Sequence, residues 1–153
     1  MADLHTTVTR TRVTRRIAAD PTSTALLVAG PTAFELWPGV RRVADVSGRL
    51  VVETDLPEGR AVAASVRALP PKRTSTAYVT RFEWIGPGLP ATSGELVLAY
   101  APTAGGEVAT HAALVLDSTI EEGSALSCHD LEAMATAFLV NLARAAELRS
   151  HAA

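Results

Sequence analysis

The fold is decided by the stretch DLEAMATAFLVNLARAAEL, residues 130–148. Its apolar residues recur at the i, i+3, i+4, i+7 spacing that lines one face of an α-helix. They are Leu131, Met134, Ala135, Phe138, Leu142, Ala145 and Ala146. An apolar face requires a partner surface, and the chain before this helix reads as alternating strands from about residue 40 onward. The pattern therefore predicts one long helix laid against one antiparallel sheet, an α+β fold, with a cavity between the two layers.

Gly, Pro and Asp residues divide the rest of the chain into short elements. Asp20-Pro21 suits a helix start, because Asp caps free N–H groups and Pro fits the first helical position. Ser47-Gly48 suits a two-residue hairpin turn. We expect short helices at Thr22–Val28 and Pro31–Leu36, and strands at His5–Ile17, Val40–Val46, Leu50–Leu56, Arg60–Leu69, Arg73–Ile85, Glu95–Tyr100 and Glu107–Asp117. Loops are expected at Leu89–Ser93 and Ile120–Ser127.

Composition limits the classes of protein. The chain has 153 residues, 48% hydrophobic and 20% charged, which predicts a single globular domain over 1–153. The net charge of −2 lacks the positive balance typical of nucleic-acid binders, so no nucleic-acid partner is expected. No apolar run reaches the ~18 residues that span a membrane. Met1–Arg16 lacks the apolar core of a secretory signal, and the single Cys128 excludes an intramolecular disulfide, so we expect a cytoplasmic protein.

Strand alternation predicts which side chains face the long helix. Polar residues such as Arg81, Glu83, His111 and Asp117 fall on the opposite face. The inward residues, with Trp37 at the mouth, form the candidate ligand-binding set: Trp37, Tyr78, Phe82, Trp84, Leu98, Tyr100, Leu114, Met134 and Phe138. Small neighbours on the same face leave volume unfilled, which predicts a cavity large enough for a ligand: Ala64, Ala68, Thr110 and Ala112.

Arg15 is the remaining candidate binding residue. The parity of Val13 and Ile17 carries Arg15 to the inner face, where an unpaired charge is costly. Its guanidinium could anchor a carboxylate or enolate of a ligand. Alternatively, Arg15 extends to water or pairs with Glu147 or Glu35, which we favour because long charged side chains commonly do so.

The sequence offers only weak candidates for a catalytic site or a metal-binding site. Cys128, His129 and Asp130 are consecutive, so their side chains diverge instead of converging as a triad; Ser127 with Asp130 instead resembles a helix-capping pair. The histidines lack ligand spacing, so neither a metal nor a cofactor is expected. The inward set holds no His or carboxylate for proton transfer, which leaves only Asp20 and Glu35 near the cavity.

The order of elements, one strand, two short helices, six strands and a long helix, resembles the helix-grip fold of the START/Bet v 1/polyketide cyclase (SRPBCC) superfamily. The resemblance rests on these motifs and their order: Ile17-Ala18-Ala19-Asp20-Pro21, Leu36-Trp37-Pro38-Gly39-Val40, Ser93-Gly94-Glu95-Leu96 with Gly105-Gly106, and Phe138-Leu139-Val140-Asn141-Leu142 with Ala146-Glu147. It implies binding or carriage of a small hydrophobic molecule such as a lipid. The alternatives are a polyketide aromatase/cyclase-type enzyme and a protein-interaction module, and a homodimer through a strand edge also stays open.

Overall fold

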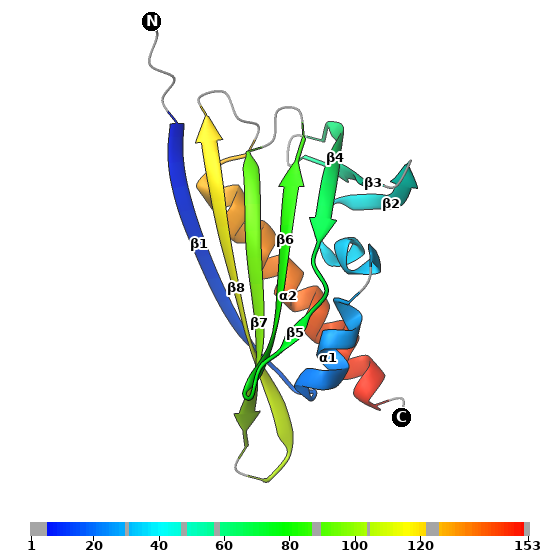
Figure 1. Cartoon of the computed structure of the whole chain (residues 1–153), viewed down its shortest axis with the longest axis vertical. Coiled ribbons are helices and arrows are strands. Elements are labelled where there is room, and N and C mark those ends of the chain that lie inside the picture. The colour runs from blue at the N-terminus through cyan, green and yellow to red at the C-terminus, as the bar shows by residue number, and fades with distance from the viewer. Residues whose placement is uncertain are drawn as a thin grey trace, which may run out of the picture.

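The computed structural model describes residues 6–29, 31–46, 49–56, 59–86, 90–103, 105–121 and 126–151. Figure 1 shows a curled sheet with the long C-terminal helix lying diagonally across one face. The elements in chain order are β1 (Thr6–Ile17), α1 (Pro21–Leu27), the 3₁₀ helix η1 (Pro31–Leu36), β2 (Val40–Val46), β3 (Arg49–Asp55), β4 (Ala61–Ala68), β5 (Lys72–Arg73), β6 (Ala77–Ile85), β7 (Ala91–Pro102), β8 (Val108–Glu121) and α2 (Cys128–His151). The predicted α+β helix-grip architecture, a curved antiparallel sheet around a C-terminal helix, is confirmed.

The sheet has eight strands in the order β1-β8-β7-β6-β4-β3-β2, with β5 paired to β6. All the strand pairs are antiparallel, and the first strand pairs with the last over its full length, from Thr6↔Glu121 to Ile17↔Thr110. This long-range pairing places the N-terminal strand beside the C-terminal part of the chain, where β1 also packs against α2. The inner face of the sheet and the inner face of α2 together enclose the apolar core.

Several predicted boundaries are wrong, and local hydrogen bonding explains them. The single strand predicted at Arg73–Ile85 is split into β5 and β6 by a tight turn at Thr74. Thr74 N donates to Ala77 O at 2.8 Å, and Ala77 N donates to Thr74 Oγ1 at 3.0 Å. The hairpin β7–β8 is longer than predicted because its pairing runs from Ala91↔Thr119 to Pro102↔Val108, which takes in part of the first expected loop. The pairing of β1 with β8 extends to Glu121, which takes in the start of the second expected loop. The predicted turn at Ser47-Gly48 lies outside the described residues.

The start of α2 is capped as the sequence predicts. Asp130 N donates to Ser127 Oγ at 3.1 Å, while Ser127 N and Ser127 Oγ donate to Asp130 Oδ2 at 2.9 and 3.0 Å. The backbone hydrogen bond from Ser127 is the main reason that the pKa of Asp130 lies below its ordinary value. This reciprocal cap fixes where the helix begins, and therefore where its inner face meets the sheet.

Asp130→Ala should lower the free energy of unfolding at neutral pH by about 0.5–2 kcal/mol, the usual cost of a lost cap. Because folding lowers the pKa of Asp130, its contribution is present in full above about pH 5 and is lost as the pH falls through the folded-state pKa. The difference in Tm between wild type and Asp130→Ala should therefore shrink toward pH 2. Thermal unfolding from pH 7 to pH 2 measures it, with the exposed Glu107→Ala as control. A constant difference would contradict the cap.

Candidate functional site

An apolar cavity lies between the N-terminal part of α2 and the sheet. Its volume is about 40 Å³. The wall is mostly carbon, with a few polar groups at one side: Trp37, Thr54, Asp55, Leu56, Phe82, Trp84, Pro90, Thr92, Leu116, Leu126, Leu131 and Met134. Ligand pockets typically enclose about 300–1,000 Å³. The expectation of an interior large enough for a whole ligand is therefore wrong for this conformation, because the aromatic side chains fill most of the space.

Trp37 is the centre of this filling. Its ring stacks on Phe138 with centroids 4.5 Å apart and meets Trp84 and Phe82 edge-on at 5.2 and 5.6 Å. Trp37 is only 5% exposed, so it lies inside the layer instead of at the mouth. A second cavity of about 20 Å³ borders the same cluster, on the side of Phe34. Trp37 and Phe82 line both of these small voids, so the two rings lie between them.

The segment after η1 holds Trp37 in this position. Asn141 Nδ2, on α2, donates to Leu36 O at 2.8 Å. Gly39 has a φ of +81°, and a Cβ added there would lie 2.7 Å from Asp55 O. Asp55 N donates to Gly39 O at 2.8 Å. A residue without a side chain is therefore required where the turn crosses the end of β3, and this crossing brings Trp37 and Asp55 to the same cavity.

The polar side of the cavity comes from the end of β3, whose residues are not among those predicted from the sequence to line it. Thr54 is 3% exposed, and its Oγ1 has no hydrogen-bond partner within the described part of the chain. Leaving a buried hydroxyl unpaired costs about 1–3 kcal/mol, so the group is unusual. The sequence signal was the alternation Val52, Thr54, which places the hydroxyl on the buried face of the strand.

Asp55 brings a carboxylate to the wall of the apolar cavity. Its Oδ2 accepts from Arg41 Nε at 2.8 Å, whereas its Oδ1 is buried with no partner within the described residues. Arg41 reaches Asp55 because the register of β2 against β3 shifts between Val40 and Arg42, a bulge that re-aims the side chain. The carboxylates expected near the cavity lie elsewhere: Asp20 caps α1 by accepting from Ser23 N, and Glu35 is exposed.

The other predicted site residues divide into two groups. Phe82, Trp84 and Met134 line the larger cavity with Trp37, and Phe138 lines the smaller one. Leu98 and Leu114 are 1% and 0% exposed and lie in the core, outside the lining of both interior cavities.

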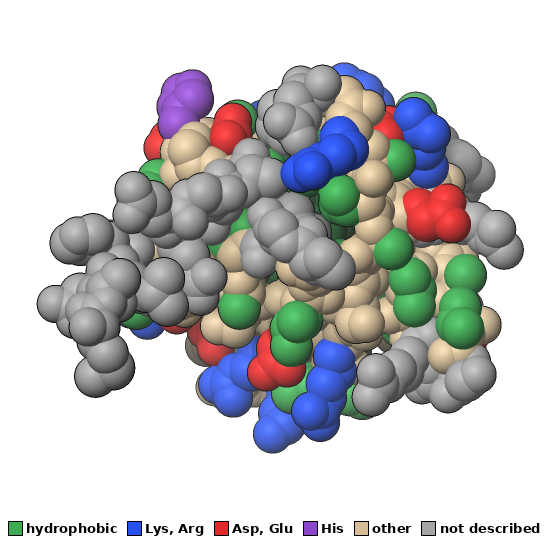
Figure 2. Space-filling model, turned by 90° about the horizontal axis from the view of Figure 1, so that it is seen from above, with side chains coloured by type: hydrophobic (Ala, Val, Ile, Leu, Met, Phe, Trp, Pro, Cys, Tyr) green, Lys and Arg blue, Asp and Glu red, His purple; other side chains and the backbone are tan. Residues whose placement is uncertain are grey.

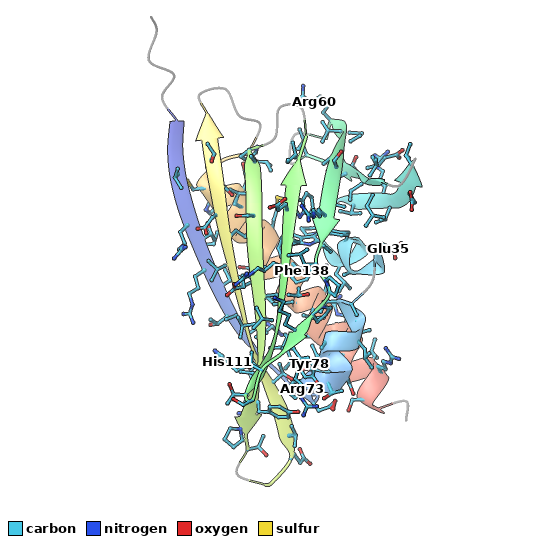
Figure 3. The ribbon with its side chains drawn as sticks, in the orientation of Figure 1. Glu35, Arg60, Arg73, Tyr78, His111 and Phe138 are labelled. Atoms are coloured by element: carbon cyan, nitrogen blue, oxygen red, sulfur yellow. The ribbon has the colours of Figure 1, made fainter. Side chains whose placement is uncertain are left out.

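Tyr78, Tyr100 and Arg15 lie away from the cavity. The hydroxyl of Tyr78 is hydrogen-bonded to Thr22 Oγ1 at 3.0 Å, and Figure 3 shows Tyr78 beside Arg73 at the far end of the sheet from Arg60. Tyr100 lies on the inner face with its pairing partner Thr110, as alternation predicts, but it is 45% exposed, because β7 and β8 extend beyond the part of the sheet that the helices cover. Arg15 pairs with Ala112 and so shares the inner face that parity predicted, but its side chain is exposed, which agrees with the favoured alternative that it extends to water.

Larger hollows lie on the surface of the described part of the chain. One of about 430 Å³ crosses the outer face of the sheet, and one of about 470 Å³ follows the outward face of α2 near Ala133 and Val140. The first is lined by exposed ion pairs, Arg10–Asp117 at 2.8 Å and Arg81–Glu95 at 3.0 Å. The hydrogen bond from Arg10 holds the pKa of Asp117 below its ordinary value. These charges already pair with each other, and exposed pairs contribute little free energy.

The end of the molecule seen in Figure 2 has basic, acidic and apolar side chains interspersed over its described surface. None of the helices in the described part of the chain is long and apolar enough to cross a membrane.

Comparison with known proteins gives matches of structure only. No family model matches the sequence, and no curated protein matches it. The Zhui aromatase/cyclase from Streptomyces sp. R1128 superposes with a TM-score of 0.67 at 17% identity, covering 94% of this chain and 96% of that one. A START superfamily protein from Mycobacterium smegmatis gives 0.61 at 16% identity, covering 92% and 95%. The major latex-like protein 151 from Panax ginseng gives 0.63 at 9% identity, covering 91% and 97%.

The di-domain aromatase/cyclase StfQ of the steffimycin biosynthetic pathway also superposes, with a TM-score of 0.62 at 16% identity. The chain covers 52% of the length of StfQ. Each of these structures superposes over more than 90% of this chain at 17% identity or less, so what they share with it is the fold. The chain therefore has the helix-grip fold of the START/Bet v 1-like (SRPBCC) proteins.

Proposed function

We propose that this protein binds or carries a small hydrophobic molecule between the sheet and α2. The observation that carries the proposal is the apolar cavity at the start of α2, where Trp84, Leu116 and Met134 surround a void that the core leaves open. Close packing is the rule in protein interiors, so a void beside unpaired polar groups is consistent with a retained binding role. The likeness of fold to a START superfamily protein supports the same class of function, because that resemblance implies binding of a hydrophobic molecule.

Because the cavity volume is only about 40 Å³, binding requires side chains to move. A ligand larger than a few atoms must displace side chains, and Met134 is the side chain best suited to move, because it is half-buried and its thioether chain is flexible. Trp37 lines this cavity, and its almost fully buried ring stacks on Phe138, so it is held in place as the floor. Affinity would come chiefly from apolar burial at about 25 cal/mol per Å².

Met134→Trp should fill the cavity and abolish ligand retention while the fold is kept. Native mass spectrometry of freshly purified protein, compared with the denatured mass, measures retention. We expect a discrete non-covalent adduct in wild type and at least a tenfold smaller adduct fraction in Met134→Trp. Leu148→Trp is the control, because Leu148 lies on the same helix and is 67% exposed. An adduct of equal intensity in Met134→Trp would place the ligand elsewhere.

A second candidate function is aromatase/cyclase-type catalysis on a polyketide-like substrate. The observation that favours it is Asp55, which brings a carboxylate to the wall of an apolar cavity and could act as general acid or base. Turnover of a poly-β-ketone thioester by wild type, lost in Asp55→Asn with binding kept, would support it. Equal turnover by the two proteins would exclude this role for Asp55.

The third candidate is a protein-interaction module. The nearly filled interior and the open hollows on the outer sheet face and on α2 favour it. This candidate predicts an adduct-free native mass and a Tm that small hydrophobic molecules do not change. The mass measurement above therefore separates it from the carrier.

A further inference from the structure

We propose that the ligand is neutral and carries a hydroxyl group, which hydrogen-bonds to Thr54 Oγ1 while the apolar body of the ligand occupies the cavity. The proposal rests on the binding function proposed above and specifies its ligand class. It starts from Thr54, whose hydroxyl is buried and unpartnered within the described residues and which lines the cavity wall. Buried polar groups normally have a partner, so an unpaired one beside a cavity marks the position of a polar ligand atom.

The other threonine of the same wall shows the contrast. Thr92 Oγ1 donates to Pro90 O at 3.0 Å and lies 3.0 Å from Ser118 Oγ. Its hydroxyl therefore serves the fold. Thr54 has the same side chain in the same wall but contributes no such bond within the described chain, so its hydroxyl is available to a ligand.

Asp55 determines the charge that the ligand can carry. It lines the same cavity, and its buried Oδ1 also lacks a partner within the described residues. A carboxylate oxygen only accepts hydrogen bonds, whereas a threonine hydroxyl donates or accepts. A ligand carboxylate would bring a second negative charge toward Asp55, and Arg41 already pairs with the first. A neutral hydroxyl avoids this repulsion and can satisfy Thr54.

The apolar lining specifies the rest of the ligand. Trp84, Leu116 and Leu131 offer no hydrogen-bond partner toward a ligand beyond the indole N–H of the tryptophan. The body of the ligand is therefore a hydrocarbon chain or ring, with its hydroxyl at the end that reaches β3. This arrangement follows the common pattern of an apolar pocket in which one or two polar groups fix the orientation.

The test compares benzene, phenol and benzoate as probes, titrated into wild type, Thr54→Val and Thr92→Val and followed by NMR. These probes share one ring and differ only in the substituent. We expect wild type to prefer phenol, and the ratio of the benzene Kd to the phenol Kd to fall at least about fivefold in Thr54→Val, because one hydrogen bond is lost. Benzoate should bind more weakly than phenol to every protein.

Stability without a probe gives a second readout. Thr54→Val should keep or raise the Tm, because it removes a hydroxyl without a partner, whereas Thr92→Val should lower the Tm. An unchanged Kd ratio in Thr54→Val, a Tm loss matching that of Thr92→Val, or benzoate binding tighter than phenol would each overturn the proposal. In those cases the binding function itself stands if benzene still binds. If none of the probes binds wild type, the binding function and the proposal both fail for small aromatic ligands.

Discussion

Trp37→Ala is expected to lower the free energy of unfolding by about 3–5 kcal/mol, the usual cost of removing a large aromatic side chain from a core. Trp37 contacts Phe82 and Trp84 from the sheet and Phe138 from α2, so it joins both layers. Its removal would leave a cavity that separates these rings, which is why we expect a cost near the upper end of the range. Urea unfolding measures it, with the fluorescence of the remaining Trp84 as the signal.

Two further variants show whether the effect is specific. Trp37→Phe keeps a ring against Phe138 and should cost less than half as much as Trp37→Ala. Ile85→Ala removes an apolar side chain that is 64% exposed, and it should change stability by less than about 0.5 kcal/mol. A cost below about 1 kcal/mol for Trp37→Ala would contradict a central role in the core. Such a result would also mean that Trp37 does not fill the space between the sheet and α2, so that this space could hold a larger ligand.

Gly39→Ala is expected to cost at least about 2 kcal/mol, from two physical causes that add. The φ of +81° disfavours any residue with a Cβ, and that Cβ would approach the carbonyl oxygen of Asp55 to 2.7 Å. The oxygen belongs to the backbone, so relief requires moving β3 or the turn that carries Trp37. Thermal and urea unfolding would measure the loss, and ligand retention should fall with it because Trp37 and Asp55 both line the cavity.

The chain offers matched controls for each cause. Gly59 has a φ of +93° but open space around it, so Gly59→Ala should show the conformational cost alone, about 1 kcal/mol. Gly105 has neither a left-handed φ nor a neighbour within 4 Å, so Gly105→Ala should be nearly neutral. If Gly39→Ala costs no more than Gly59→Ala, the close approach to Asp55 has no energetic importance.

Sequence periodicity predicted which side chains are buried wherever one face of a helix or strand is covered along its length. Leu131, Phe138 and Leu142 are buried on α2 as their spacing indicates, and Phe82, Trp84 and Leu114 are buried on the sheet as alternation indicates. Alternation failed for Tyr100, which is exposed although its parity is correct. Parity tells which face a side chain occupies, but not whether the opposite layer extends far enough to cover it.

The candidate site was only partly predictable for a related reason. Met134 was predicted from the apolar stripe of the long helix and Trp37 from its place beside the Trp37-Pro38 turn, and both line the cavity. The cavity volume depends on how Trp37 stacks between residues far from it in the chain, which no local pattern contains. Thr54 and Asp55 were missed because an isolated polar residue near a strand end is ordinary in sequence. It becomes notable only when packing removes its partners.

The sequence by itself determined the features that depend on neighbours along the chain: the amphipathic stripe of α2, the Ser127–Asp130 cap, the Asp20-Pro21 start of α1 and the alternation of the strands. These follow from interactions within a few residues, which local propensity and hydrogen bonding control. Only the tertiary structure decided that β1 pairs with β8, that Trp37 fills the centre, and that the buried Thr54 hydroxyl borders a cavity. Those features depend on residues brought together from distant parts of the chain, where packing and the burial of polar groups, not local pattern, determine the outcome.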